Sequence, residues 1–212
     1  MQKQTIIAKY NEDITWIKEL ECPVIIYDKF QNQDLPNVGR DLQTYAHHIA
    51  THYNELADLN VFLQGNPFDH CQETVTKVNT VIFTEFLPLT DIFRLTHKSG
   101  IPYFPYLPLE SVYQELTGKP LPDLIKFISG AQFAASREQI QRHPQATYAR
   151  MATMATEIDR YPHVFERLIG ILIGGEKKWG IDKQSPIFLD YIKLMTKSLN
   201  DGTFDLIISL SW

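Results

Sequence analysis

Short apolar runs and a one-sided helical pattern alternate over the first third of the chain. Thr5–Tyr10 (TIIAKY) is typical of a short strand, and Pro23–Tyr27 (PVIIY) of a strand buried on both faces. Over Gly39–Leu56, apolar residues recur three or four positions apart, which predicts a helix with one buried face. Its apolar positions are Leu42, Tyr45, Ala46, Ile49, Tyr53 and Leu56. The next predicted strand is Asn60–Leu63.

The later part of the chain carries more helical than strand patterns. Ile101–Leu109 (IPYFPYLPL) contains three prolines among aromatic residues, which favours an ordered loop. Further strands are predicted at Ile125–Ser129, Gln132–Ala135 and Phe204–Leu210, and helices at Asp13–Leu20, Ser136–Arg142, Gln145–Arg160, Pro162–Ile173 and Pro186–Leu199.

The β-α-β-α-β order of the first third predicts an α/β fold with a mostly parallel central sheet flanked by helices. The length of 212 residues suits a single domain. We therefore expect one α/β domain over residues 1–212, with a mainly helical C-terminal part from about residue 136.

Composition and charge exclude several classes of protein. Hydrophobic residues make up 44% and charged residues 21% of the chain, as in ordinary globular proteins. The formal net charge of −5 and the lack of a basic run argue against binding to nucleic acid phosphates. No apolar stretch reaches the roughly 20 residues that span a bilayer. We expect a soluble, cytoplasmic protein whose distant cysteines, Cys22 and Cys71, do not imply a disulfide.

Three polar clusters follow directly after predicted strands. In parallel sheets, ligands bind beyond the carboxyl ends of the strands, which meet at one edge. The sequence therefore predicts a binding site built from Asn11-Glu12-Asp13, Asp28-Lys29 and Gln64-Gly65-Asn66.

Two further segments extend this predicted site. After the third strand, Asp69 and His70 suit a ligand or metal site, or Asp69 caps a helix that starts near Gln72. Before the long helix, Asn37-Val38-Gly39-Arg40-Asp41 suits a diphosphate, because helix-start amides and an arginine bind anions. The alternative is an ordinary helix capped by Asn37, with Arg40 paired to Asp41 or a neighbour.

Other residues allow a functional and a structural interpretation. His48 and His52 have the spacing of a zinc-binding helix without its glutamate, and partly exposed surface histidines are the favoured interpretation. Gly130 and Ala131 beside Gln132 allow close approach of a substrate or simply close packing. Glu166 lies with Arg167 in an apolar helix, either as a solvent-facing pair or as an inward catalytic acid with its partner.

Five segments together resemble an uncharacterised domain family found in bacteria and fungi, whose members have no known function. They are YNED, LPNVGRD, VFLQGNPFDH, GAQFAASREQI and VFERLIGILIGG, and the resemblance spans about Thr5 to Gly175. No G-x-S-x-G, P-loop or G-x-G-x-x-G sequence occurs, so serine-hydrolase, P-loop and dinucleotide-binding interpretations lose their main support.

The order of these segments is also similar to that of GT-A glycosyltransferases, which transfer sugars from nucleotide-diphosphate donors. The resemblance implies that Tyr10-Asn11-Glu12 forms the loop after the first strand and that Asp28 faces the nucleotide base. It implies that the turn from Asn37 to Gly39 opens the long helix. The family's metal-binding Asp-x-Asp is replaced by Gln64-Gly65-Asn66, and amides are poor ligands for Mg²⁺ or Mn²⁺.

The same resemblance implies roles for the remaining candidates. Asp69 and His70 would supply the contacts to a divalent metal, or the protein is metal-independent. Arg40 would assist the departing diphosphate, and Glu166 would take the proton of the acceptor hydroxyl. Ile101–Leu109 would form an acceptor wall, although a loop that covers the core is favoured.

We therefore expect a glycosyltransferase-like protein whose partners are a nucleotide-sugar and a hydroxyl acceptor. The first alternative is a non-catalytic carbohydrate or nucleotide-sugar binding domain. A second alternative is a metal-dependent hydrolase centred on Asp69, His70 and the helix histidines. The predicted donor-binding residues are Asn11, Glu12, Asp28, Asn37, Gly39, Arg40, Gln64, Asn66 and Gln132.

Overall fold

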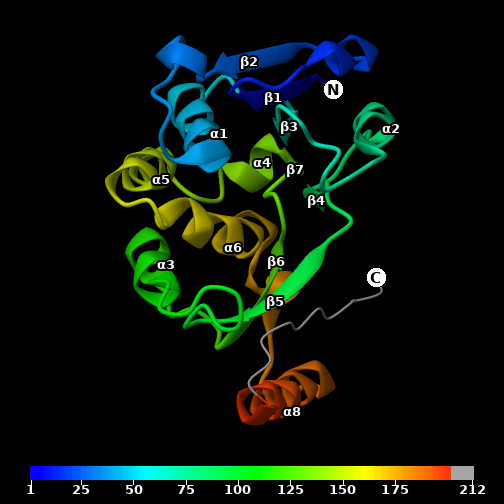
Figure 1. Cartoon of the computed structure of the whole chain (residues 1–212). Coiled ribbons are helices and arrows are strands. Elements are labelled where there is room, and N and C mark those ends of the chain that lie inside the picture. Colours follow the sequence, from blue (N-terminus) through cyan, green and yellow to red (C-terminus); the bar gives the residue numbers. More distant parts are fainter. Residues whose placement is uncertain (202–212) are drawn as a thin grey trace.

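A five-stranded sheet forms the centre of the computed structural model, which describes residues 1–201 (Figure 1). Its strand order is β2-β1-β3-β7-β4. The central strand pairs, β1 with β2 and β1 with β3, are parallel, whereas β7 runs antiparallel to both of its neighbours. The bounds are β1 Lys3–Lys9, β2 Val24–Asp28, β3 Leu59–Gln64, β4 Phe86–Pro88 and β7 Phe133–Ser136. The predicted α/β class with a mostly parallel sheet and flanking helices is confirmed.

Alternate residues of the strands pack on opposite faces of this sheet, as the two-residue period of a strand requires. On one face, Ile6 and Phe62 join the larger apolar cluster. On the other face, Ile7 and Val61 pack with Trp16 and other side chains of a smaller cluster. The sheet is therefore buried on both sides.

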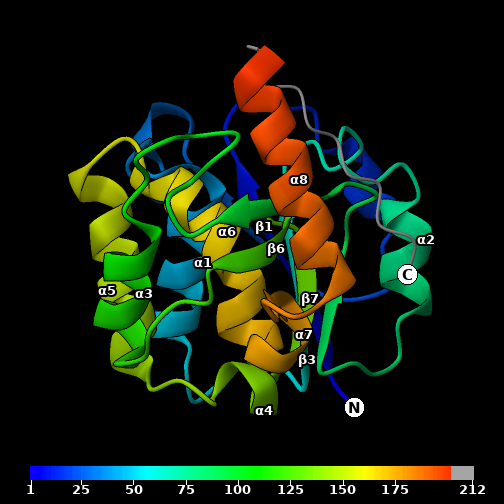
Figure 2. The same ribbon diagram turned by 90° about the horizontal axis from the view of Figure 1, so that it is seen from below.

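Helices of different size cover the two faces. The larger cluster contains side chains from α1 (Arg40–Thr51), α5 (Gln145–Glu157) and α6 (Tyr161–Gly174). The opposite face is covered by α2 (Thr74–Thr80) and by the 3-10 helix η1 (Thr15–Glu19). Figure 2 shows α2 on the side of the sheet opposite to α1 and α5.

A second, antiparallel sheet has the strand order β5-β6-β8. Its strands are β5 Phe93–His97, β6 Leu124–Ile128 and β8 Gly180–Ile181. Ile125 and Ile128 of β6 belong to the same apolar cluster as the central sheet, so the two sheets share a core. The remaining helices are η2 Phe30–Asn32, α3 Leu109–Thr117, α4 Arg137–Ile140, α7 Glu176–Trp179 and α8 Pro186–Asp201.

Several predicted elements differ from those observed. β2 is the edge strand and Ile26 is 36% exposed, so the prediction of a strand buried on both faces was wrong. The long helix ends at Thr51, and the residue after it, His52, occupies the C-cap. The segment at Asp13–Leu20 forms only a 3-10 helix. The predicted strand Phe204–Leu210 lies outside the described residues.

The loop before α3 is confirmed as irregular backbone. Both cysteines are free thiols. None of the helices within residues 1–201 is long and apolar enough to cross a bilayer.

Candidate functional site

A cleft of about 430 Å³ lies at the carboxyl edge of the parallel strands. The ends of β1 and β3, the loops after β1, β2 and β3 and the start of α1 line it. The lining residues are Ala8, Lys9, Tyr10, Glu12, Lys29, Asn37, Arg40, Asp41, Gln64, Asn66 and Asp69. Six of the predicted site residues therefore line one opening, namely Glu12, Asn37, Arg40, Gln64, Asn66 and Asp69, and Gly39 adjoins Arg40 in the chain.

The strand register explains why these residues meet. Lys9 lies opposite Asp28 in β2, and Ala8 lies opposite Gln64 in β3, so the three strands end at the same level. The loops after β1 and β3 are tied together because the Trp16 indole donates a hydrogen bond to the carbonyl oxygen of Gly65 at 2.9 Å.

Asp28 lies beside the cleft in an ion pair. Its Oδ2 is 2.5 Å from Lys9 Nζ, and its Oδ1 accepts a hydrogen bond from the Phe30 amide at 2.8 Å. Burial would raise the pKa of Asp28, but these two hydrogen bonds and the lysine charge outweigh it and lower the pKa. Asp28 is therefore ionised and paired.

The loop after β1 holds one predicted residue in the cleft and one outside it. The Glu12 carboxylate accepts a hydrogen bond from the Tyr10 amide at 2.7 Å, which fixes the loop. Asn11 is exposed and does not line the cleft.

Lys29 holds the turn before α1. Its side chain is 3% exposed, and its Nζ donates to the carbonyl oxygens of Val38 and Arg40, both at 2.6 Å. Between those carbonyls, Gly39 (φ +66°) and then Arg40 (φ +52°) adopt left-handed conformations, the second of which is unusual for a residue with a side chain. Burial lowers the pKa of Lys29 to about 8, although the nearby Asp41 acts to raise it.

The interpretation of Asn37 as the helix cap was wrong. Gly39 occupies the N-cap and no side chain caps the helix there. Within residues 1–201, the Arg40 side chain forms no ion pair, so it does not pair with Asp41. Arg40 is exposed at the cleft.

Asp41 is a half-buried carboxyl group in the cleft. Its Oδ2 accepts a hydrogen bond from Gln64 Nε2 at 2.8 Å. Burial raises the pKa of Asp41, and the charge of Glu166 raises it further, despite the lowering effect of the hydrogen bonds.

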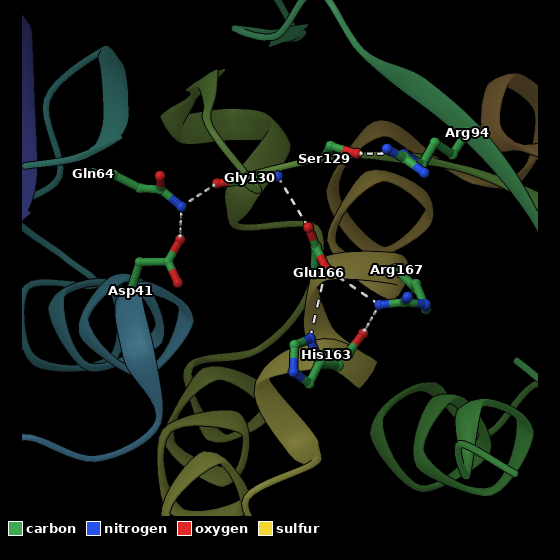
Figure 3. A network of polar contacts seen from close by, with 8 residues as sticks. All are labelled: Asp41, Gln64, Arg94, Ser129, Gly130, His163, Glu166 and Arg167. Carbon is green, nitrogen blue, oxygen red and sulfur yellow. Dashed lines mark hydrogen bonds and ion pairs between the residues drawn. The ribbon is translucent and has the colours of Figure 1, made fainter. Parts of the chain in front are cut away.

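A chain of hydrogen bonds leads from the cleft toward α6 (Figure 3). Gln64 Nε2 also donates to the carbonyl oxygen of Gly130 at 3.0 Å, and the amide of Gly130 donates to Glu166 Oε1 at 3.0 Å. Gln132 is fully buried and bonds the Gln64 amide and the Pro67 carbonyl, so it supports the loop after β3 and does not line the cleft.

Glu166 lies outside the cleft in an inward ion pair (Figure 3). Its Oε2 is 3.2 Å from Arg167 Nη1 and 4.0 Å from His163 Nδ1. Burial would raise the pKa of Glu166, but His163, Arg167 and the Gly130 amide lower it. The pair is not solvent-facing, because Arg167 is 4% exposed and packs over the rings of Phe127 and Phe104.

The aromatic loop before α3 packs around this ion pair. Phe104 stacks on His163 with ring centres 4.7 Å apart, and Arg94 lies over the Tyr103 ring at 4.8 Å. Tyr106 is 90% exposed. The loop therefore packs against the ion pair through Phe104, which stays 37% exposed, and leaves the Tyr106 ring in solvent.

Asp69 and His70 do not form a metal site by themselves. Asp69 is exposed and its Oδ2 accepts from Asn66 Nδ2 at 3.2 Å. The His70 ring packs on Gly130 (φ +81°), where a Cβ would lie 2.3 Å from the ring. In the part of the chain that the structure describes, no group of three or more His, Cys, Asp or Glu side chains could hold a metal ion. Asp69 also does not cap α2, which follows Glu73.

The helix histidines have structural partners. His48 is buried, its Nδ1 lies 3.0 Å from the Tyr27 hydroxyl, and its Nε2 lies 3.3 Å from Gln4 Nε2. Since both nitrogens are engaged, His48 cannot act as a zinc ligand. The interpretation of His48 as a surface residue was wrong, whereas His52 is partly exposed.

The sequence placed Lys29 and Asp41 in the predicted site but gave neither residue a role of its own. Both stood inside segments that the sequence singled out, next to Asp28 and Arg40. Their burial, which distinguishes them from ordinary surface charges, depends on how β2, β3 and α1 come together.

Comparison with known proteins identifies a family without assigning a reaction. Residues 5–97 and 105–183 match the family described as protein of unknown function DUF3431. No curated protein and no solved structure matches the chain. Because the match covers most of the sequence, the chain belongs to the DUF3431 family.

Proposed function

We propose that the chain binds a nucleotide-diphosphate sugar in the cleft and transfers the sugar to a hydroxyl acceptor. The observation that carries this proposal is the convergence of the strand-end residues on one opening. Glu12, Asn37, Arg40, Gln64 and Asn66, which come from three separate segments, all line it. The cleft volume of about 430 Å³ lies in the range of small-molecule sites.

One cationic side chain, Arg40, supports an anionic donor in a cleft that the carboxylates of Glu12, Asp41 and Asp69 also line. Lys9 is neutralised by Asp28, and the Lys29 ammonium is directed at two carbonyls. Arg40 remains exposed with its guanidinium available for bidentate contact with a phosphate. Such a contact stabilises the diphosphate as it leaves with the electron pair of the sugar–oxygen bond. Among the described residues, Asp69 and His70 have no third His, Cys, Asp or Glu side chain to complete a metal site, so dependence on Mn²⁺ or Mg²⁺ is an outcome of the test.

A second candidate is a nucleotide-sugar binding protein without catalysis. The observation in its favour is that Glu166, the carboxylate predicted to be the base, is ion-paired outside the cleft.

Calorimetry with UDP-glucose, UDP-N-acetylglucosamine and GDP-mannose, with and without Mn²⁺, tests both candidates. We expect Arg40→Ala to weaken binding by about 10- to 100-fold, since a charge-assisted phosphate contact contributes roughly 1.5–3 kcal/mol. Arg142→Ala is the matched control, because Arg142 lines a different cavity. If Mn²⁺ strengthens binding, Asp69→Ala should remove that gain.

The outcomes separate the candidates. Binding together with release of free UDP or GDP supports the transferase. Binding without release, in water or with methyl glycosides as acceptors, supports the binding protein. Absence of binding to every donor contradicts both.

A further inference from the structure

We infer that Asp41 is the catalytic base of this cleft and receives the proton of the acceptor hydroxyl. This inference rests on the proposed function and names the residue that performs its proton transfer. It replaces Glu166, the carboxylate that chain order suggests for this role.

Among the carboxylates of the cleft, Asp41 has the environment of a positioned base. Glu12 is bonded to the Tyr10 amide within its own loop. Asp69 is exposed on the loop after β3. The Asp41 carboxylate is half-buried, and Gln64 Nε2 fixes its orientation at 2.8 Å. Gln64 is itself held by the Gly130 carbonyl at 3.0 Å, so the base is oriented by a third group, as in other proton-transfer sites.

The groups around Asp41 favour proton uptake more than those around Glu166. Burial and the negative charge of Glu166 raise the pKa of Asp41, which brings it closer to the pH at which a general base works best. Glu166 has a lowered pKa, and both of its oxygens already have donors. The titratable and charged groups that face Asp41 or share its cleft are Tyr45 on α1, Lys29 after β2, Glu166 on α6, and Lys9, Glu12, Arg40 and Asp69.

The proposed step is a single displacement. The acceptor oxygen forms a bond to the anomeric carbon while its proton moves to the Asp41 carboxylate. The bond between the anomeric carbon and the diphosphate oxygen breaks, and its electron pair leaves on the diphosphate beside Arg40. Asp41 later returns the proton to solvent, so no oxidant, reductant or further reactant is needed.

Turnover of the donors that bind, measured as release of UDP or GDP, tests the inference. Asp41→Asn should lower kcat by about 100- to 10,000-fold and leave the donor Kd within a few-fold, since it removes the base but little volume. Glu166→Gln should retain turnover within tenfold. Glu157→Gln is the matched control at an exposed ion pair on α5 and should change neither quantity.

The pH dependence of kcat/KM distinguishes a base at Asp41 from a structural role of Asp41. Its acid limb, the fall of kcat/KM at low pH, reports the protonation of the base. Removing the negative charge in Glu166→Gln should shift the acid limb to lower pH, because that charge raises the pKa of Asp41. Removing the hydrogen bond in Gln64→Met should shift the acid limb to higher pH, because that bond lowers the pKa of Asp41. These two variants keep the test decisive if Asp41→Asn does not fold.

Three results would overturn the inference. The first is loss of turnover in Glu166→Gln together with normal turnover in Asp41→Asn. The second is an acid limb that moves in neither pH variant. The third is donor binding without any turnover by the wild type, which leaves no proton to transfer. Absence of donor binding would instead refute the proposed function itself.

Discussion

At the scale of single residues, burial changes the chemistry of ordinary side chains. His48 is 1% exposed between Tyr27 and Gln4, and burial, together with the charges of His52 and His47, lowers its pKa to about 3. His48 therefore stays neutral in the folded protein across the physiological range, whereas in the unfolded chain it titrates near its ordinary pKa of 6.5.

This difference predicts acid sensitivity. Between pH 6.5 and about 3 the unfolded chain binds more protons than the folded one, so the free energy of unfolding falls as the pH drops through this window. Replacing His48 with Gln should reduce that slope by up to one proton, about 1.4 kcal/mol per pH unit. Urea unfolding of the wild type and the variant at a series of pH values measures it. An unchanged slope in His48→Gln would show that another group causes the sensitivity.

At the scale of elements, short segments depend on tertiary contacts for their position. The helix α7 has only four residues, too few to be stable alone. Its Trp179 is 3% exposed, packs against Gly170 and Gly174 of α6, and meets the Phe86 ring of β4 edge-on at 5.4 Å.

We expect Trp179→Ala to lower the free energy of unfolding by about 3–5 kcal/mol, because it leaves a large cavity between α6 and β4. Phe83→Ala, at a position 67% exposed, should change stability by no more than about 0.5 kcal/mol. Chemical denaturation compares the two variants. A loss below 1 kcal/mol for Trp179→Ala would mean that α7 is not held by this side chain.

At the scale of the whole molecule, one apolar cluster joins the two sheets. Phe62 and Phe133 of the central sheet and Ile125 and Ile128 of the second sheet belong to it. A shared core couples the stability of both parts.

The chain should accordingly unfold in one transition. Circular dichroism, which follows the backbone, and tryptophan fluorescence, which follows Trp16, Trp179 and Trp212, should give coincident denaturation curves. The calorimetric and van't Hoff enthalpies of unfolding should agree. Two separate midpoints would instead show that the sheets form independent domains.

Features that depend on local spacing were readable from the sequence. The stripe Leu42, Tyr45, Ala46 and Ile49 is buried as its spacing predicts, because a helix places those positions on one face whatever lies beneath it. The strand-end position of Glu12 and Gln64 was equally local, since it follows from where each apolar run stops. The parallel order of the first strands then brings these residues to one edge.

Other features depend on which distant segments meet, and only the tertiary structure decided them. A continuous apolar run does not distinguish an edge strand from a central one, so the sequence wrongly predicted that β2 is buried on both faces. The environments of Lys29, Asp41 and Glu166 depend on partners such as Gly130, which lies 66 positions from Gln64 and 36 from Glu166. Burial and pairing across such separations leave no periodic pattern in the sequence. The sequence therefore determined which edge of the sheet bears the cleft, whereas the packing of distant segments determined which carboxylates line it.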